Sequence, residues 1–288
     1  MNVKLKKIDQ AVLFLKQNLH LFKCPYCDAA FKDIDEYSIV CIKNHRFDLS
    51  KKGTLYLLKR KTTNDYDNQE MWTARRNLLQ HGFFDGILEL ILAHFPDNDL
   101  NVLDAGCGEG TALSELSFAR KKFNDNYIGF DLSKEAINLA TQQEMSNFFC
   151  IADITALPFQ NDSFDVLLDI LTPSAYQEFN RVLKTNGMLL KVIPNSHYLI
   201  ELRHRLYTPD DPNYSYDNQA VLKHFKEMYP NSEIEHVKYK FPLNAKLAHD
   251  LVKMTPLQWG SSMDEKEILK TPLEYVTVDF SLLIAYCK

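Results

Sequence analysis

Four side chains that commonly bind metal ions stand close together near the start of this 288-residue chain. Cys24 and Cys27 are separated by two residues, Cys41 and His45 by three, and thirteen residues lie between the two pairs. Thiolates and imidazoles in such paired spacing are typical of a tetrahedral, structural zinc site. The alternative is two unrelated cysteine pairs beside a chance histidine. We predict a structural Zn²⁺ site formed by Cys24, Cys27, Cys41 and His45.

The segment that carries these ligands is too short to fold on an apolar core of its own. A bound metal would supply the missing stability. Residues 1–22 have the apolar spacing of an amphipathic helix, so we predict an N-terminal module over residues 1–58. Residues 59–70 are polar and without periodicity, which is typical of a linker. Residues 71–288 are then expected to form the larger domain.

A second set of candidate residues surrounds a glycine-rich loop. Asp104 ends an apolar segment, and Gly106, Cys107, Gly108 and Gly110 follow. Glycines let the backbone approach a ligand closely, because they have no Cβ. The third glycine comes one residue earlier than in the dinucleotide pattern G-x-G-x-x-G, which disfavours a nicotinamide oxidoreductase. A glycine triplet alone is explained equally well by a tight turn.

Acidic residues at the ends of the next two predicted strands argue against a plain tight turn. Asp131, followed by Leu132, is placed to hold ribose hydroxyls, and Asp153, followed by Ile154, to accept from an adenine amino group. Ligands of open α/β sheets bind at the carboxyl ends of the strands, where all these residues are expected. The set predicts a nucleoside-containing cofactor.

Strand-like and helix-like segments alternate through the middle of the chain, which predicts an α/β fold with a mostly parallel sheet covered by helices. The expected strands are residues 100–103, 127–130, 148–151, 165–170 and 188–192, and the expected helices are residues 111–120, 134–143 and 176–183. Residues 275–286 form one long strand-like run, predicted as an antiparallel edge or near-edge strand of a mixed sheet. Residues 71–95 are expected to be helical with a break at Gly82, and the polar residues 195–232 to be an insertion.

Charge is unevenly distributed along the chain. The net charge is -5, yet residues 1–61 carry 13 Lys and Arg against 6 Asp and Glu. A basic module on an acidic body can bind phosphates locally, although a solvated lysine-rich face explains the charge equally well. Without a run of about 20 apolar residues or a signal-peptide core, the sequence predicts a cytoplasmic protein with no membrane partner.

Several motifs taken together resemble a known family. They are Cys24-Pro-Tyr-Cys27, Cys41 with His45-Arg-Phe-Asp48, Ala74-Arg75-Arg76, the loop at residues 104–110 followed by Asp131 and Asp153, and Met254-Thr255-Pro256. The loop and the two acids look like the Rossmann-like class I methyltransferases. The whole set is similar to the bacterial 23S rRNA (guanine-N1)-methyltransferases, in which a zinc module precedes the catalytic domain and contributes to RNA binding. The resemblance implies S-adenosyl-L-methionine as cofactor and a 23S rRNA hairpin by the peptide tunnel as partner.

Two further segments narrow the resemblance. Residues 167–174 and 191–194 look more like the Gram-positive branch that is linked to tylosin resistance, which implies guanine 748 as the target rather than guanine 745. Lys43, Arg46, Lys51 and Lys52 are then the expected phosphate contacts on the N-terminal module. Arg75 and Arg76 would contact RNA or the carboxylate end of the cofactor, or would only form salt bridges on a surface helix.

Methyl transfer needs a nucleophile held in line with the donated methyl group, so positioning does most of the work. Asp169, expected at the end of the fourth strand, is our candidate base for the N1 proton of guanine; the alternative is that it only orients the cofactor or a nearby loop. A flipped target base would need an apolar wall. Tyr176, Phe179 and Trp259 can serve, although such residues are more often core.

Other functions remain open at this stage. The first is methylation of another RNA, a small molecule or a protein by the same cofactor site, which leaves the basic N-terminal module unexplained. The second is a nonenzymatic, zinc-dependent RNA-binding protein with a decayed methyltransferase fold, against which the intact glycine loop and the two acids speak. The sequence also leaves the oligomeric state open, a homodimer included.

Overall fold

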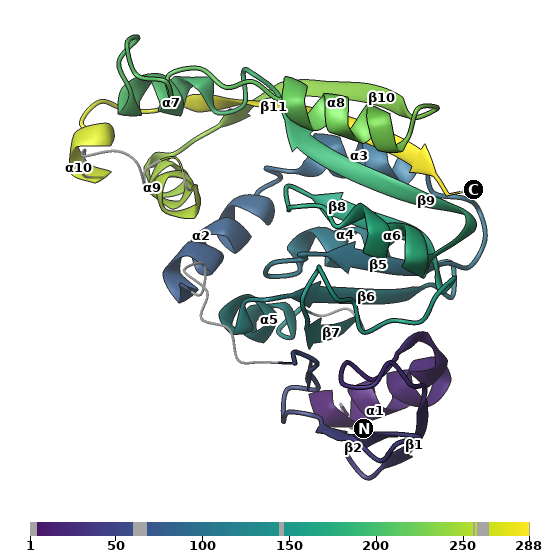
Figure 1. The fold of residues 1–288 in the computed structure, drawn as a ribbon. Helices are drawn as coiled ribbons and strands as arrows, with labels where there is room; N and C mark the ends of the chain where they lie inside the picture. Colours follow the sequence, from purple (N-terminus) through teal and green to yellow (C-terminus); the bar gives the residue numbers. More distant parts are fainter. Residues whose placement is uncertain (1–4, 60–67, 144–146, 256, 258–264, 288) are drawn as a thin grey trace. The chain divides into compact units, whose positions relative to one another are not determined.

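The computed structural model describes residues 5–59, 68–143, 147–255, 257 and 265–287. They form two compact units (Figure 1). Of the described residues, the first unit comprises 5–59, 96–143, 147–189 and 286–287, and the second comprises 68–95, 190–255, 257 and 265–285. Both candidate sets of chemistry-bearing residues, the cysteine–histidine group and the glycine loop with its acids, belong to the first unit.

The first unit begins with the helix expected near the N-terminus. Helix α1 spans Lys7–Asn18 and continues into a 3-10 turn, η1, at Leu19–Leu21. A small antiparallel sheet follows, in the order β1-β2-β3, with strands at Phe31–Asp35, Ser38–Cys41 and Arg46–Asp48. Strand β2 therefore ends at one candidate metal ligand, Cys41, and β3 begins directly after another, His45.

The predicted parallel strands are confirmed. They are β5 (Asn101–Ala105), β6 (Asn126–Asp131), β7 (Phe148–Ile151) and β8 (Phe164–Ile170), arranged in the order β8-β5-β6-β7. The connecting helices are α4 (Thr111–Ala119), α5 (Lys134–Ala140) and α6 (Tyr176–Val182). Helix α6 ends one residue before its predicted end because Leu183 already begins the long strand β9 (Leu183–Pro194), which was expected only from residue 188.

The N-terminal segment packs directly against this sheet. Strand β4 (Leu55–Tyr56) pairs in parallel with β7, and the N–H of Leu57 donates to the carbonyl of Ile151 at 2.8 Å. Phe14 stacks on Phe148 with ring centroids 5.1 Å apart. The candidate metal-binding segment and the candidate cofactor sheet thus share one hydrophobic core inside the first unit.

The second unit contains helices α2 (Gln69–Leu79) and α3 (Asp85–Ala93), separated at Gly82 as predicted. Helix α2 begins inside the predicted linker, because the side chain of Asn68 accepts the N–H groups of Glu70 and Met71 and so caps the helix. Residues 60–67 of that predicted linker lie outside the described residues.

The rest of the second unit is built around the end of β9. Strand β11 (Tyr275–Tyr286) lies between β9 and the edge strand β10 (Glu233–Pro242), and it runs antiparallel to β10. The predicted near-edge strand is therefore confirmed. Helices α7 (Ile200–Leu206) and α8 (Gln219–Met228) occupy the predicted insertion, and α9 (Ala245–Met254) and the short α10 (Glu265–Ile268) follow β10. Within the described residues, no helix is long and apolar enough to cross a bilayer.

Candidate functional site

The strand registers place the predicted cofactor residues at one edge of the parallel sheet. Ala105 is paired with Phe130, Asp131 with Ile151, and Asp104 with Leu168. The carboxyl ends of β5, β6, β7 and β8 therefore meet, and each is followed by residues singled out in the sequence. This edge is where ligands of open α/β sheets bind.

The glycine loop after β5 needs its glycines for two separate reasons. Gly106, Gly108 and Gly110 have φ values of 70°, 56° and 81°, a region that side chains with a Cβ rarely adopt. A Cβ on Gly106 would also stand 2.4 Å from Oγ1 of Thr172, in the loop after β8. The loops that follow these two neighbouring strands are thus pressed together, with no room for a side chain between them.

Asp131 fixes the same loop from the other side. Its Oδ2 accepts the N–H of Gly108 at 2.9 Å, and its Oδ1 accepts the N–H of Ser133 at 2.8 Å. A carboxylate has about four lone-pair sites, so acceptor capacity remains for ribose hydroxyls. Asp131 and the next residue, Leu132, are both half-buried.

The loop after β7 is a tight turn centred on the second predicted acid. Oδ1 of Asp153 accepts both the N–H and the hydroxyl of Thr155, at 2.8 and 2.7 Å. Asp153 and Ile154 are half-buried, whereas Thr155 is exposed. The turn therefore has a sheltered end beside β7 and an open end that faces solvent.

Two other predicted cofactor residues lie at the end of β5 and in the loop after it, Asp104 buried and Cys107 half-buried. Asp104 is buried under the glycine loop, with 2% of its surface exposed. Burial, reinforced by Asp104 and Asp131, raises the pKa of the Cys107 thiol well above its usual range. Cys107 is therefore a neutral packing residue of the loop and a poor nucleophile.

Asp169 is buried at the end of β8 with none of its surface exposed. Its Oδ2 accepts a short hydrogen bond from the hydroxyl of Ser174, which draws the loop after β8 back onto the strand. Leu171, within this loop, has a φ of 58°, so the backbone there is strained. The arrangement favours the alternative role for Asp169, the orientation of this loop. The sequence pattern of residues 167–174 did not predict these contacts of Thr172 and Ser174.

The two described candidates for the apolar wall of a flipped base are both buried. Tyr176 is 8% exposed and Phe179 is fully buried, and their rings meet edge to face at 6.3 Å. Phe179 is a core residue of the first unit, whereas the hydroxyl of Tyr176 lies beside Ser174 and Asp169 at the loop after β8. Trp259, the third candidate, lies outside the described residues.

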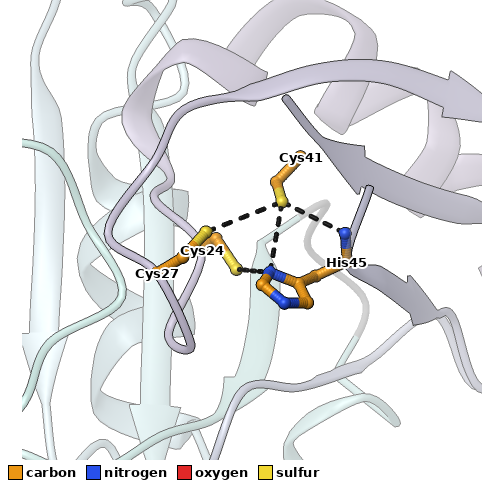
Figure 2. A group of neighbouring side chains, drawn as sticks. All are labelled: Cys24, Cys27, Cys41 and His45. Atoms are coloured by element: carbon orange, nitrogen blue, oxygen red, sulfur yellow. Dashed lines mark hydrogen bonds between the residues drawn. The ribbon is translucent and has the colours of Figure 1, made fainter. Parts of the chain in front are cut away.

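The four predicted metal ligands converge on one point, as Figure 2 shows. Their ligand atoms all lie within 4.8 Å of one another. Sγ of Cys27 and Cys41 are 3.8 Å apart, and Nδ1 of His45 is 3.4 Å from Sγ of Cys24 and 3.5 Å from Sγ of Cys41. Tetrahedral ligands of zinc are spaced by about 3.8 Å between sulfurs and about 3.5 Å between sulfur and nitrogen. The donor set and its spacing fit such an ion.

The backbone around the cluster prepares one thiol for metal binding. The N–H of His45 donates to Sγ of Cys41 at 3.2 Å. Burial alone would raise the pKa of Cys41, but N–H donors from His45 and Lys43 bring it down to about 7, which favours the thiolate. Burial raises the pKa of Cys24 to about 11. The site is thus partly prepared for a cation.

The predicted RNA-binding side chains differ in their exposure and in the ion pairs that they already form. Lys43, Lys51 and Lys52 are exposed. Arg46 is engaged by two carboxylates, those of Asp35 and Asp48. In the second unit, Arg75 and Arg76 are half-buried on α2, and the guanidinium of Arg75 lies 5.3 Å from the ring centre of Phe84. Sequence reasoning missed Tyr26, which is 54% exposed and stacks on Phe47 beside the metal ligands.

The sequence of this chain is similar to those of known proteins. The methyltransferase domain family matches residues 96–271. YxjB of Bacillus subtilis, provisionally named a 23S rRNA (guanine-N1)-methyltransferase, is 37% identical over 275 residues, which cover 92% of this chain and 96% of that protein. The 23S rRNA (guanine(748)-N1)-methyltransferase of Streptomyces fradiae is 28% identical over 65% of this chain and 68% of its own length.

Solved structures are more distant. The YcgJ protein of Bacillus subtilis is 16% identical, with a TM-score of 0.47 over 70% of this chain and 97% of its own. The family assignment rests on the sequence relatives.

Proposed function

Because the chain belongs to the 23S rRNA (guanine-N1)-methyltransferase family of S-adenosyl-L-methionine-dependent enzymes, we propose that it methylates N1 of a guanine in 23S rRNA. The observation that carries this proposal is the 37% identity to YxjB over 92% of the chain, which includes both the cysteine–histidine cluster and the glycine-loop sheet. A protein that shared only the cofactor fold would match over the sheet alone.

The residues at the sheet edge would hold the cofactor. The glycine loop would receive its amino-acid part, Asp131 the ribose hydroxyls, and Asp153 with Ile154 the adenine. When bound, S-adenosyl-L-methionine supplies a methyl group on a positively charged sulfur. The reaction breaks that S–C bond, forms an N1–C bond, and releases the N1 proton, leaving a neutral thioether.

Asp169 would act in this reaction by holding a loop in position, and not by accepting the N1 proton. Its bond to Ser174 holds the loop after β8, and Thr172 of that loop is pressed against Gly106. The loop therefore joins the cofactor side to the place where a target base would enter. Removal of the N1 proton would then fall to water or to a group on the RNA.

We also propose that zinc fills the cysteine–histidine cluster and that the surrounding module grips the RNA. The ligand spacing described above supports zinc. The exposed side chains of Lys43, Lys51 and Lys52 support phosphate contacts on the same segment. Arg46 is a weaker candidate, because two carboxylates already compete for its guanidinium.

The resemblance of residues 167–174 and 191–194 to the tylosin-resistance branch favours guanine 748 in the tunnel-lining hairpin. The similarity to the Streptomyces fradiae enzyme, whose name specifies that guanine, supports the same choice. Such a methylation would protect a ribosome against macrolides of the tylosin type.

The decisive experiment is transfer of labelled methyl from S-adenosyl-L-methionine to 23S rRNA that lacks the modification, followed by primer extension. A methyl group on N1 blocks the Watson–Crick edge, so reverse transcriptase should stop one nucleotide before the target. A single stop at guanine 748 is the expected result. Incorporation without a stop at any guanine would overturn guanine-N1 methylation, and no incorporation despite cofactor binding would point to another substrate.

A further inference from the structure

A groove lies in the first unit between the metal-binding turn and the loop that follows β7. Its walls are Lys23, Pro25, Asp28 and Lys59 on one side, and residues 155–157 with Glu178 on the other. Its volume is about 200 Å³. Pockets that enclose a whole cofactor or drug-sized ligand usually exceed about 300 Å³, so this groove fits only one segment of a longer molecule.

The two walls are joined directly beneath the groove. The N–H of Lys23 donates to the carbonyl of Pro158 at 2.9 Å, and the N–H of Gln160 donates to the carbonyl of Leu21 at 2.9 Å. The rings of Phe22 and Phe159 pack 5.3 Å apart in the core below. Because main-chain hydrogen bonds and a buried aromatic pair fix the walls, the groove is preformed.

The charges of the groove leave one cation in excess. Asp28 pairs with Lys23 at 3.1 Å. Glu178 pairs with Arg181 at 2.7 Å and also accepts the N–H of Leu157; burial opposes its ionisation, but Arg181 and this N–H lower its pKa. Lys59 is exposed and has no ion pair within the described residues. The Asp28–Lys23 pair is a weak surface pair, since Asp28 is 66% exposed, so Lys23 can also turn towards an anion.

The groove borders both parts of the proposed catalytic edge. Thr155 and Ala156 on its wall belong to the same turn as Asp153, the proposed adenine-side acid. Glu178 stands on α6, four residues after Ser174 of the loop that Asp169 holds. A polymer that leaves the catalytic edge towards the metal-binding turn would therefore pass along this groove.

We propose that the groove binds the sugar–phosphate backbone of single-stranded RNA next to the target nucleotide, with a phosphate held by Lys59 and Lys23. This inference rests on the proposed function, since it assumes an RNA substrate. A target guanine in a hairpin loop has single-stranded neighbours, and their backbone is the anionic, narrow chain that a groove of this size and charge accepts.

The test compares Lys59→Glu with Lys122→Glu. Lys122→Glu is the control, because it makes the same charge change in the same unit. The Lys122 side chain is 71% exposed and 3.7 Å from the carboxylate of Asp97. Binding of a labelled hairpin fragment of 23S rRNA is measured across a salt series, together with binding of S-adenosyl-L-methionine. We expect Lys59→Glu to weaken RNA binding about tenfold and to reduce the salt slope by about 1, as loss of one phosphate contact should. Cofactor binding should stay unchanged in both variants.

A second variant, Ala156→Trp, fills the groove without a change of charge. Because the indole would displace the phosphate from Lys59 and Lys23, it should weaken RNA binding and lower the salt slope as Lys59→Glu does. The proposal is overturned if Lys59→Glu behaves like Lys122→Glu, or if its loss appears in cofactor binding instead. Failure of the proposed function has a different signature, because the unaltered protein would then neither bind nor methylate the rRNA fragment.

Discussion

The backbone N–H of Gly108 and the carboxylate of Asp131 are 2.9 Å apart, so the end of β6 holds the glycine loop that follows β5. One acidic side chain thereby sets the shape of the loop and, in the proposed function, also binds the ribose of the cofactor. Replacing it should disturb both at once.

We predict that Asp131→Asn weakens binding of S-adenosyl-L-methionine about 10- to 100-fold. Hydrogen bonds to a charged acceptor contribute about 1.5–3 kcal/mol, and the amide would also turn an N–H₂ group towards one of the two backbone N–H donors. Isothermal titration calorimetry measures the change. Asp97→Asn, at a carboxylate that is 88% exposed, is the control and should bind normally. Equal affinity in the two variants would remove Asp131 from the cofactor site.

Gly106→Ala should damage the same site by a steric route. The positive φ alone costs about 1–2 kcal/mol for a residue with a Cβ, and the new methyl group would collide with Thr172. We expect at least a tenfold loss of cofactor affinity and a lower melting temperature. Adding Thr172→Ala should restore only part of the loss, because it relieves the collision and leaves the backbone strain. Full recovery in the double variant would show that φ at this position is unimportant.

The metal cluster yields a prediction about metal content and activity. The purified protein should contain one zinc ion per chain by atomic emission, and Cys24→Ser should lose it, because three ligands bind zinc far more weakly than four. Methylation of rRNA should then disappear while cofactor affinity stays nearly intact. Cys287→Ser removes a thiol that contacts Asn180, well away in sequence from the four ligands, and should keep its zinc. Retention of the metal by Cys24→Ser would refute this ligand set.

The two roles considered for Asp169 predict different pH–rate profiles. A general base replaced by Asn should lose the ionisation that limits the rate, whereas an orienting residue should lower kcat and leave the shape of the profile unchanged. We expect the second result, because the carboxylate is buried and bonded to Ser174. Ser174→Ala should then lower kcat by a similar factor, and the double variant should be little worse than either single one. A changed profile in Asp169→Asn alone would restore the base.

Much of the catalytic sheet was predictable because each strand is a short apolar run that ends in a chemically distinctive residue. Asp104, Asp131 and Asp153 mark three strand ends in the sequence itself. Strand β10 was missed although its Val237, Tyr239 and Phe241 alternate with lysines, which is the pattern of a half-buried strand. Its hydrogen bonds come from β11, a partner distant in sequence.

The candidate site likewise has one part that the sequence predicted and one part that it did not. Ligand types and spacing identified the metal cluster, because metal coordination depends on a few residue types. The contact of Gly106 with Thr172 and the bond of Ser174 to Asp169 depend on two loops meeting across neighbouring strands. Such contacts leave no periodic signal. The groove beside Lys59 is likewise formed by segments about a hundred residues apart.

The pairing of β4 with β7 limits which segments of this protein can be removed. Strand β7 lies between β6 and β4, so the two residues of β4 cover what would otherwise be an open edge of the sheet. Removing the N-terminal segment would bare that edge together with Phe148 and Phe159. A chain shortened to the methyltransferase fold alone would therefore be prone to aggregate. For the same reason, the metal-binding segment cannot be exchanged for another segment that lacks the pairing with β7.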